Sequence, residues 1–283
     1  MPSILITGAS TGIGLACAQR FDQRGWRVFA GVRRDEDAAR LRELGSARLE
    51  PVLLDVTDAA SVAAARDQVA AAVGEDGLGA LVNNAGVAVI GPLEFVDLDD
   101  LRQLFDVNLI GLLGVTQQCL PLLRRARGRI VNIGSISGRI ASPFVGPYSA
   151  SKFALEALTD ALRMEVAHFG IEVSVVEPGM IATPIWDKGE REAEARRAAF
   201  PPEAQELYGW LMEAFSRMVR PAIARAAPAD LVAEAVEHAV TSSEPKTRYV
   251  VGKDARLRLF LKAVLSDRAM DRLVRAALSR SAS

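Results

Sequence analysis

The chain has 283 residues, of which 50% are hydrophobic and 24% are charged, and its formal net charge is −1. This composition predicts a globular protein with one α/β domain and a substantial core, and the near-neutral charge gives no basis for nucleic-acid binding. The first strand pattern begins at Ser3, which leaves no room for a signal peptide, and no apolar run reaches membrane-spanning length, so we expect a cytoplasmic protein.

Short apolar strand patterns alternate with helical patterns along the chain. Seven segments are predicted as strands: Ser3–Ile6, Arg27–Gly31, Leu49–Leu54, Ala80–Val82, Arg129–Ile133, Glu172–Val176 and Arg248–Val251. Helices fill the intervals, and several are expected to end at glycine, as at Gly25 and Gly170. Val/Ile/Leu-rich strands joined by helices predict a doubly wound, Rossmann-type α/β fold over residues 1–252, with a parallel seven-stranded sheet covered on both faces. In such a fold the ligand lies beyond the carboxyl ends of the strands.

A glycine-rich loop follows the first strand and runs directly into a predicted helix. Glycine permits a tight turn, and the free N–H groups and positive dipole at the helix start attract a pyrophosphate. The spacing G-x-x-x-G-x-G differs from the commoner G-x-G-x-x-G, yet its place after the first strand favours nucleotide binding over a plain turn. The candidate cofactor residues here are Gly8, Ser10, Gly12, Ile13 and Gly14.

The end of the second strand bears on the ribose of the cofactor. A carboxylate at this position hydrogen-bonds a 2′-hydroxyl, whereas an arginine accommodates a 2′-phosphate. Here Val32 is followed by Arg33 and Arg34, which predicts NADP(H) rather than NAD(H). The acidic residues at 35–37 follow closely and are able to pair with these arginines.

Polar residues also follow the third and fourth strands. Asp55, with Val56 beside it, is placed to bond the adenine edge of a nucleotide. The fourth strand is followed by Asn84, Ala85 and Gly86, although asparagine and glycine are also ordinary turn residues.

Ser135, Tyr148 and Lys152 are spaced so that three side chains are able to surround one carbonyl. Tyr148 and Lys152 are four residues apart and share a helix face. A tyrosine hydroxyl titrates at about pH 10, and a neighbouring ammonium favours the phenolate and lowers that pKa. Since Y-x-x-x-K arises by chance in many helices, the weight of this pattern depends on its surroundings.

Two segments interrupt the strand–helix alternation. The stretch at about 185–227 has no strand pattern and holds two of the three tryptophans. We predict a helical lid over the substrate, with a helical pair that extends the core as the alternative. The stretch 253–283 carries eight Lys/Arg and three Asp/Glu, and is predicted as a basic amphipathic helical extension. Such a surface is a solvated helix face, an oligomer contact or a membrane-surface contact.

Neither cysteine nor histidine indicates a disulfide or a metal site. Cys17 and Cys119 fall in apolar helical patterns, which predicts buried reduced thiols. His168 and His238 lie far apart without metal-like spacing. No metal is therefore expected.

Taken together, these segments resemble the short-chain dehydrogenase/reductase family from about Ser3 to Pro184 and again near Val250. The matching residues are Thr7-Gly-Ala-Ser-Thr-Gly-Ile-Gly14, Asn83-Asn-Ala-Gly86, Asn108, Ser135, Tyr148-x-x-x-Lys152 and Pro178-Gly179-x-x-x-Thr183. Six ordered matches at strand ends make the resemblance specific.

The resemblance implies a role for each matching residue. Tyr148 would be the general acid in ketone reduction and the base in alcohol oxidation, and Lys152 would lower its pKa and hydrogen-bond the nicotinamide ribose. Ser135 would polarise the substrate oxygen, and Asn108 would hold a water that links Lys152 to solvent. The nicotinamide carboxamide would be held by Pro178, Gly179, Ile181 and Thr183. One departure is Thr11, where many NADP-preferring members carry a basic residue, so the NADP(H) prediction rests mainly on Arg33.

The expected substrate is a lipophilic ketone, aldehyde or secondary alcohol. Residues placed to line the pocket are nearly all apolar and include Val89, Ile140, Phe144, Trp186 and Tyr208. The second strand end and the long lid look similar to hydroxysteroid and retinol dehydrogenase branches. Two alternatives remain: a reductase of a polar or carrier-bound carbonyl, and a cofactor-sensing protein without turnover. The family habit implies a homodimer or homotetramer through helices at 97–125 and 147–169.

Overall fold

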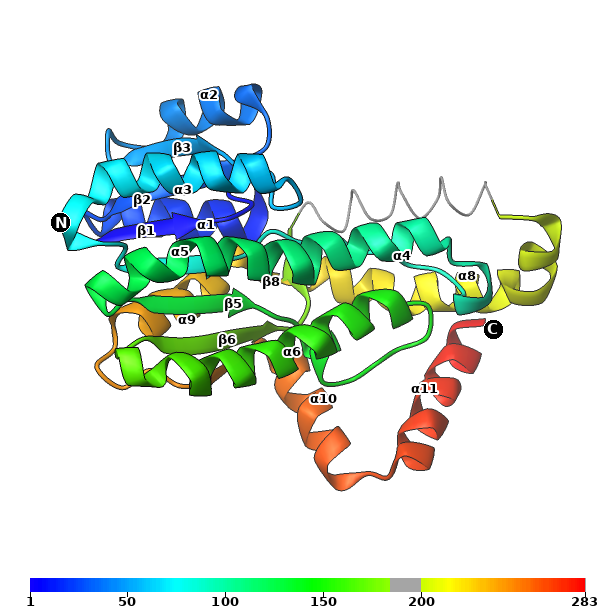
Figure 1. The fold of residues 1–283 in the computed structure, drawn as a ribbon. Helices are drawn as coiled ribbons and strands as arrows, with labels where there is room; N and C mark the ends of the chain where they lie inside the picture. Colours follow the sequence, from blue (N-terminus) through cyan, green and yellow to red (C-terminus); the bar gives the residue numbers. More distant parts are fainter. Residues whose placement is uncertain (184–199, 283) are drawn as a thin grey trace.

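Seven parallel strands form one sheet in the order β3-β2-β1-β4-β5-β6-β9 (Figure 1). The computed structural model describes residues 1–183 and 200–282. The strands are β1 (Ser3–Ile6), β2 (Arg27–Val32), β3 (Leu49–Leu53), β4 (Ala80–Asn83), β5 (Arg129–Ile133), β6 (Glu172–Pro178) and β9 (Arg248–Val251). The chain moves from β1 outward to β3, then returns to β4 on the other side of β1. The carboxyl ends of β1 and β4 therefore flank the crevice where such sheets bind ligands.

Helices cover both faces of the sheet. The helices of the described residues are α1 (Gly12–Gln23), α2 (Asp35–Leu44), α3 (Ala59–Val73), α4 (Leu98–Phe105), α5 (Leu112–Ala126), α6 (Gly146–Val166), α8 (Pro202–Ala224), α9 (Ala229–Thr241), α10 (Lys253–Val264) and α11 (Asp267–Ala282). Of these, α11 packs on α8 and extends away from the sheet (Figure 1). The glycines expected to close helices do so, since Gly25 and Gly170 have φ of +80° and +74°.

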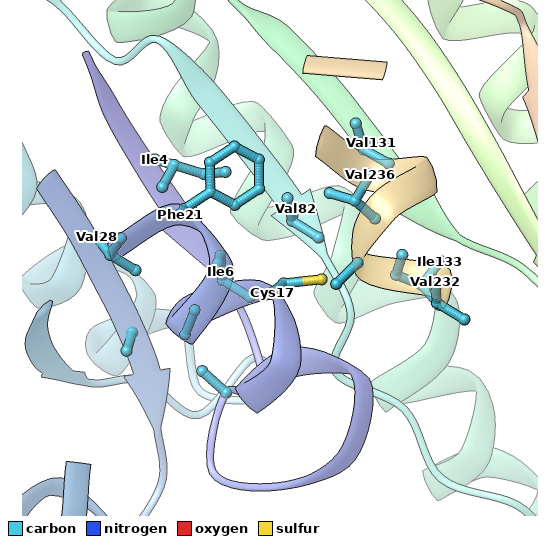
Figure 2. Close-up of a cluster of buried hydrophobic side chains, with 14 of the residues drawn as sticks. Ile4, Ile6, Cys17, Phe21, Val28, Val82, Val131, Ile133, Val232 and Val236 are labelled. Carbon is cyan, nitrogen blue, oxygen red and sulfur yellow. The ribbon is translucent and has the colours of Figure 1, made fainter. Parts of the chain in front are cut away.

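Alternate strand residues build two separate cores. Ile4 and Ile6 of β1 face a cluster that includes Phe21 of α1 and Val236 of α9 (Figure 2). Leu5 points the other way, into a cluster formed with α3, α5 and α6. Because the β1 side chains are buried on both faces of the sheet, the strand is apolar from Ile4 to Ile6. This arrangement confirms the predicted doubly wound fold.

Both thiols are buried, as predicted from their helical patterns. Cys17 of α1 lies in the core shown in Figure 2, and Cys119 of α5 lies in the core on the opposite face. Burial raises the pKa of each thiol to about 12. Both are therefore inert packing residues at neutral pH.

The strand predictions hold with small differences at the ends. The largest concerns β6, which continues to Pro178 rather than ending at Val176. A short pairing of β7 (Ile181–Ala182) with β8 (Ala227–Pro228) was not predicted. It brings the chain after β6 next to the start of α9.

The predicted lid and tail are helical where they are described. Residues 184–199 of the lid region, including Trp186, lie outside the described residues, and the remainder is mainly the single helix α8. The tail forms two helices, α10 and α11, rather than one. Within the described residues, no helix is both long enough and apolar enough to cross a membrane.

Candidate active site

The glycine loop between β1 and α1 is shaped by steric limits on its glycines. Gly8 and Gly12 have φ of +64° and +57°, a region that L side chains rarely adopt. A Cβ on Gly14 would lie 2.3 Å from the Gly8 carbonyl oxygen. The first turn of α1 therefore packs directly on the loop, and its free N–H groups face the crevice beyond β1.

Thr7 and Asn84 lock the glycine loop to the loop after β4. Thr7 Oγ1 accepts hydrogen bonds from the backbone N–H groups of Asn84 and Ala85, each at 2.9 Å. Asn84 Nδ2 donates in return to the carbonyl oxygens of Thr7 and Gly8, each at 2.9 Å. The Asn-Asn-Ala-Gly segment is thus a clamp on the glycine loop and more than an ordinary turn.

Three arginines lie at the end of β2. Arg33 is exposed, and Arg34 Nε is paired with Asp37 Oδ2 at 3.1 Å. The third, Arg40 of α2, was missed by the sequence reasoning. Its guanidinium donates to the carbonyl oxygen of Ser10 in the glycine loop and also lies near Asp37. This end of β2 therefore places three guanidinium groups beside the nucleotide loop, two of which already contact Asp37.

Asp55 is placed beyond β3 as predicted, but its carboxylate is already engaged. Asp55 Oδ1 accepts from the backbone N–H of Thr57 at 2.9 Å and from its hydroxyl at 2.7 Å. Burial opposes ionisation, but these hydrogen bonds and the charge of Arg33 together hold the pKa of Asp55 below its usual range. The carboxylate is thus ionised near neutral pH and close to Arg33.

Asn108 lies in a π-helical turn, Asp106–Gly111, between α4 and α5. Its side chain exchanges two hydrogen bonds with the backbone of Val87, at 2.8 and 2.9 Å, and donates to Ser151 Oγ at 3.0 Å. Asn108 is 1% exposed. It therefore ties the loop after β4 to α6, one residue before Lys152. Such π-turns concentrate at functional sites, and this one was not predicted from the sequence.

Ser135, Tyr148 and Lys152 come together at the carboxyl end of β5. Ser135 follows the strand, and its side chain hydrogen-bonds Tyr148 at the start of α6. Lys152 Nζ lies 5.8 Å from the centre of the Tyr148 ring and donates to the Ile133 carbonyl oxygen at 2.8 Å. The spacing in the sequence predicted that these three side chains lie together. They form one cluster because the end of β5 and the first turns of α6 meet at this point.

The pKa of Tyr148 does not follow the sequence expectation. Burial raises it, and the hydrogen bond from Ser135 lowers it by less, so the pKa lies above its usual value. Burial also lowers the pKa of Lys152 to about 8, against the opposing charge of Glu156. Burial therefore dominates the pKa of Tyr148, and the hydrogen bond from Ser135 is the cause that lowers it.

A buried carboxylate pair lies behind Lys152 and was not predicted. Glu156 of α6 and Glu177 of β6 are 6% and 0% exposed. Arg248 Nε reaches Glu156 Oε2 at 3.2 Å and Glu177 Oε1 at 3.3 Å, while Arg139 reaches Glu177 at 2.9 Å. Burial, followed by repulsion from Glu177, raises the pKa of Glu156 to about 7. Glu156 is therefore a carboxyl group with a raised pKa beside the Tyr148–Lys152 cluster.

The loop after β6 completes the edge of the crevice. Pro178 ends β6, and Gly179 N donates to the Val251 carbonyl oxygen at 2.8 Å. Ile181 is 3% exposed in β7, and Thr183 follows it at the margin of the described residues. The predicted nicotinamide residues thus lie beyond the strand next to β5, on the same edge of the sheet as Ser135.

Comparisons with known proteins agree with this arrangement. Residues 2–194 match the model of the short chain dehydrogenase family. Mouse retinol dehydrogenase 5 is 41% identical over 285 residues, which cover 99% of this chain and 89% of the relative. Human 17-beta-hydroxysteroid dehydrogenase type 6 is 42% identical over 259 residues, covering 89% and 81%. The crystal structure of a short chain dehydrogenase from Burkholderia cenocepacia in complex with NADP is 28% identical, with a TM-score of 0.71 over 98% of this chain and 97% of that one.

Proposed function

The chain belongs to the short-chain dehydrogenase family and is an NAD(P)-dependent oxidoreductase, and on that basis we propose that it interconverts a lipophilic alcohol and its ketone or aldehyde with NADP(H). The observation that carries this proposal is the cluster of Ser135, Tyr148 and Lys152 beside the glycine loop. The chain's residues fit the cofactor, because Gly14 lets the first turn of α1 pack directly on the glycine loop, where the free N–H groups of the helix would receive a pyrophosphate.

Each member of the cluster has a distinct role in this proposal. The cofactor supplies or accepts a hydride when bound. Tyr148 donates its hydroxyl proton to the substrate oxygen during reduction and accepts it during oxidation. Ser135, already bonded to Tyr148, donates to the same oxygen as negative charge develops there. Lys152 holds positive charge near the Tyr148 ring and would hydrogen-bond the ribose hydroxyls of the bound cofactor.

The preference for NADP(H) rests on the arginines after β2. Arg33 is exposed at the strand end, and Arg40 is anchored to the glycine loop through Ser10. No carboxylate of the described structure ends β2 itself. Guanidinium groups recognise phosphate through several donors at once, so this surface suits a 2′-phosphate.

The cofactor preference is testable by one substitution with a control. We expect Arg33→Ala to weaken NADP+ binding about tenfold or more and leave NAD+ binding within about twofold, since one charged hydrogen bond contributes roughly 1.5–3 kcal/mol. Arg42→Ala, further along α2, is the control. Equal affinity of the unmodified protein for NAD+ and NADP+ would overturn the preference.

The lipophilic substrate is supported by apolar residues around the cluster. Ile140 and Phe144 are buried in the loop that leads to Tyr148, and Val89 is buried in the loop after β4. Phe144 has a φ of +64°, and its ring packs edge-on against Phe215 of α8 at 5.5 Å. Two relatives are named for retinol and 17-beta-hydroxysteroid. A retinoid or hydroxysteroid alcohol therefore fits the proposal better than a polar substrate.

The experiment is turnover of retinoid and steroid alcohols with NADP+, followed by NADPH absorbance. We expect Tyr148→Phe to lower kcat by at least about a hundredfold while NADP+ affinity stays within about twofold, because the hydroxyl acts on the proton and the ring remains in place. Undiminished turnover in Tyr148→Phe would refute the assigned role. Turnover confined to polar carbonyls would refute the substrate class.

A further inference from the structure

The first turn of α10 is bonded to the loop that follows β6. β9 pairs with β6 so that Val251 lies opposite Pro178. Three residues later, Asp254 Oδ2 accepts the backbone N–H of Met180 at 2.9 Å. The C-terminal tail is thus attached to the segment that would hold the nicotinamide.

Two glycines make room for the Asp254 carboxylate. A Cβ on Gly179 would lie 2.4 and 2.5 Å from its two oxygens, and a Cβ on Gly252 would lie 2.5 Å from Oδ1. Gly252 also has a φ of +110°, which a side chain would strain. Any other residue at either position would push the carboxylate off Met180, so the contact depends on both glycines.

The same helix contacts the two other segments of the cluster. Ala255 is 0% exposed and packs with Ile136 and Ile140, and Ile136 directly follows Ser135. Arg258 Nη2 donates to Ser142 Oγ at 2.9 Å, in the loop that leads to Tyr148. Arg258 is half-buried, and this burial lowers the pKa of its guanidinium against the opposing charge of Asp254. α10 therefore contacts the segments that carry the nicotinamide loop, Ser135 and Tyr148.

We propose that Asp254 and Arg258 are positioning residues, through which α10 sets the cofactor loop and the substrate loop respectively. The proposal rests on the proposed function for the identity of these loops. Asp254 acts through the Met180 backbone and governs cofactor affinity. Arg258 acts through Ser142 and governs the placement of the loop beside the substrate. Helix α10 of the basic tail thus contributes to the site by positioning its loops.

The cofactor arm uses calorimetric titration of the full-length protein with NADP+. We expect Asp254→Ala to raise the Kd about three- to tenfold, the range for one lost hydrogen bond. Asp254→Asn keeps an acceptor and should stay within about twofold of the unmodified protein, as should the control Lys253→Ala in the same turn. Asp254→Glu is a second variant, and its longer chain is expected to weaken binding as alanine does. An unchanged Kd in Asp254→Ala and Asp254→Glu, or equal losses in Asp254→Ala and Asp254→Asn, would overturn the proposal.

The substrate arm compares Arg258→Ala with Arg256→Ala, an exposed arginine of the same helix. We expect Arg258→Ala to raise the KM for the alcohol about threefold or more, with the Kd for NADP+ within about twofold. Arg256→Ala should change neither value, and identical KM values in both variants would refute the role of Arg258. A protein that binds NADP+ without any turnover would refute the proposed function, while the Asp254 comparison would still decide the cofactor arm.

Discussion

The buried Glu156–Glu177 pair predicts an unusual dependence of stability on pH. The pKa of Glu156 is raised from 4.5 to about 7 in the folded protein. A raised folded pKa means that the folded state holds the proton more tightly. Its contribution to stability is fully present below the unfolded pKa and is lost as the pH rises through about 7. For these two values, the free energy of unfolding falls by about 2 kcal/mol between about pH 5.5 and pH 8.

Glu156→Gln removes this titration while keeping the shape of the side chain. The unmodified protein should lose about 2 kcal/mol of unfolding free energy through this group between about pH 5.5 and pH 8, and the variant should not. The difference between variant and unmodified protein should therefore shift by about 2 kcal/mol in favour of the variant as the pH rises over this range. Urea unfolding at each pH, followed by circular dichroism, measures this difference. Glu165→Gln, an exposed residue of the same helix, is the control and should show no such change. Parallel pH dependence in Glu156→Gln and the unmodified protein would refute the reasoning.

Two further predictions concern the cofactor loop and the polar core. Gly14→Ala places a Cβ 2.3 Å from a carbonyl oxygen and should weaken NADP+ binding at least about tenfold by titration. Gly114→Ala, with open space around it, should stabilise α5 by about 0.5–1 kcal/mol. An unchanged NADP+ affinity in Gly14→Ala would contradict the steric argument. Asn132 is 0% exposed and bonds Asn83 and Thr159 at 2.9 Å each. Asn132→Leu should cost about 2–4 kcal/mol in urea unfolding because both partners lose a bond, and a loss below about 0.5 kcal/mol would contradict this.

The sequence predicted those features that depend on local pattern. The β1 strand and its glycine loop follow from an apolar run and three glycines within one short segment. Tyr148 and Lys152 share a helix face because they are four residues apart. These features need no knowledge of distant residues, so the fold and the central cluster could be identified before any coordinates.

The missed features depend on contacts between distant parts of the chain. Glu156, Glu177 and Arg248 come from α6, β6 and β9, and each alone reads as an ordinary charged residue. Arg40 and Asp254 occur in charged helical segments that look solvated. Only the three-dimensional arrangement shows which charges are buried or aimed at the site. The direction of the Tyr148 pKa shift was also missed, because it depends on burial.

The raised pKa of Tyr148 and the lowered pKa of Lys152 have the same physical origin. Burial disfavours the charged form of each, so a phenolate at Tyr148 is most accessible while Lys152 keeps its proton. Glu156, one turn further along α6, supports that proton by its negative charge. Glu156 ionises as the pH rises through about 7, a range that overlaps the titration of Lys152, whose pKa is about 8. The buried pair therefore extends, toward higher pH, the range over which Tyr148 has a cationic neighbour.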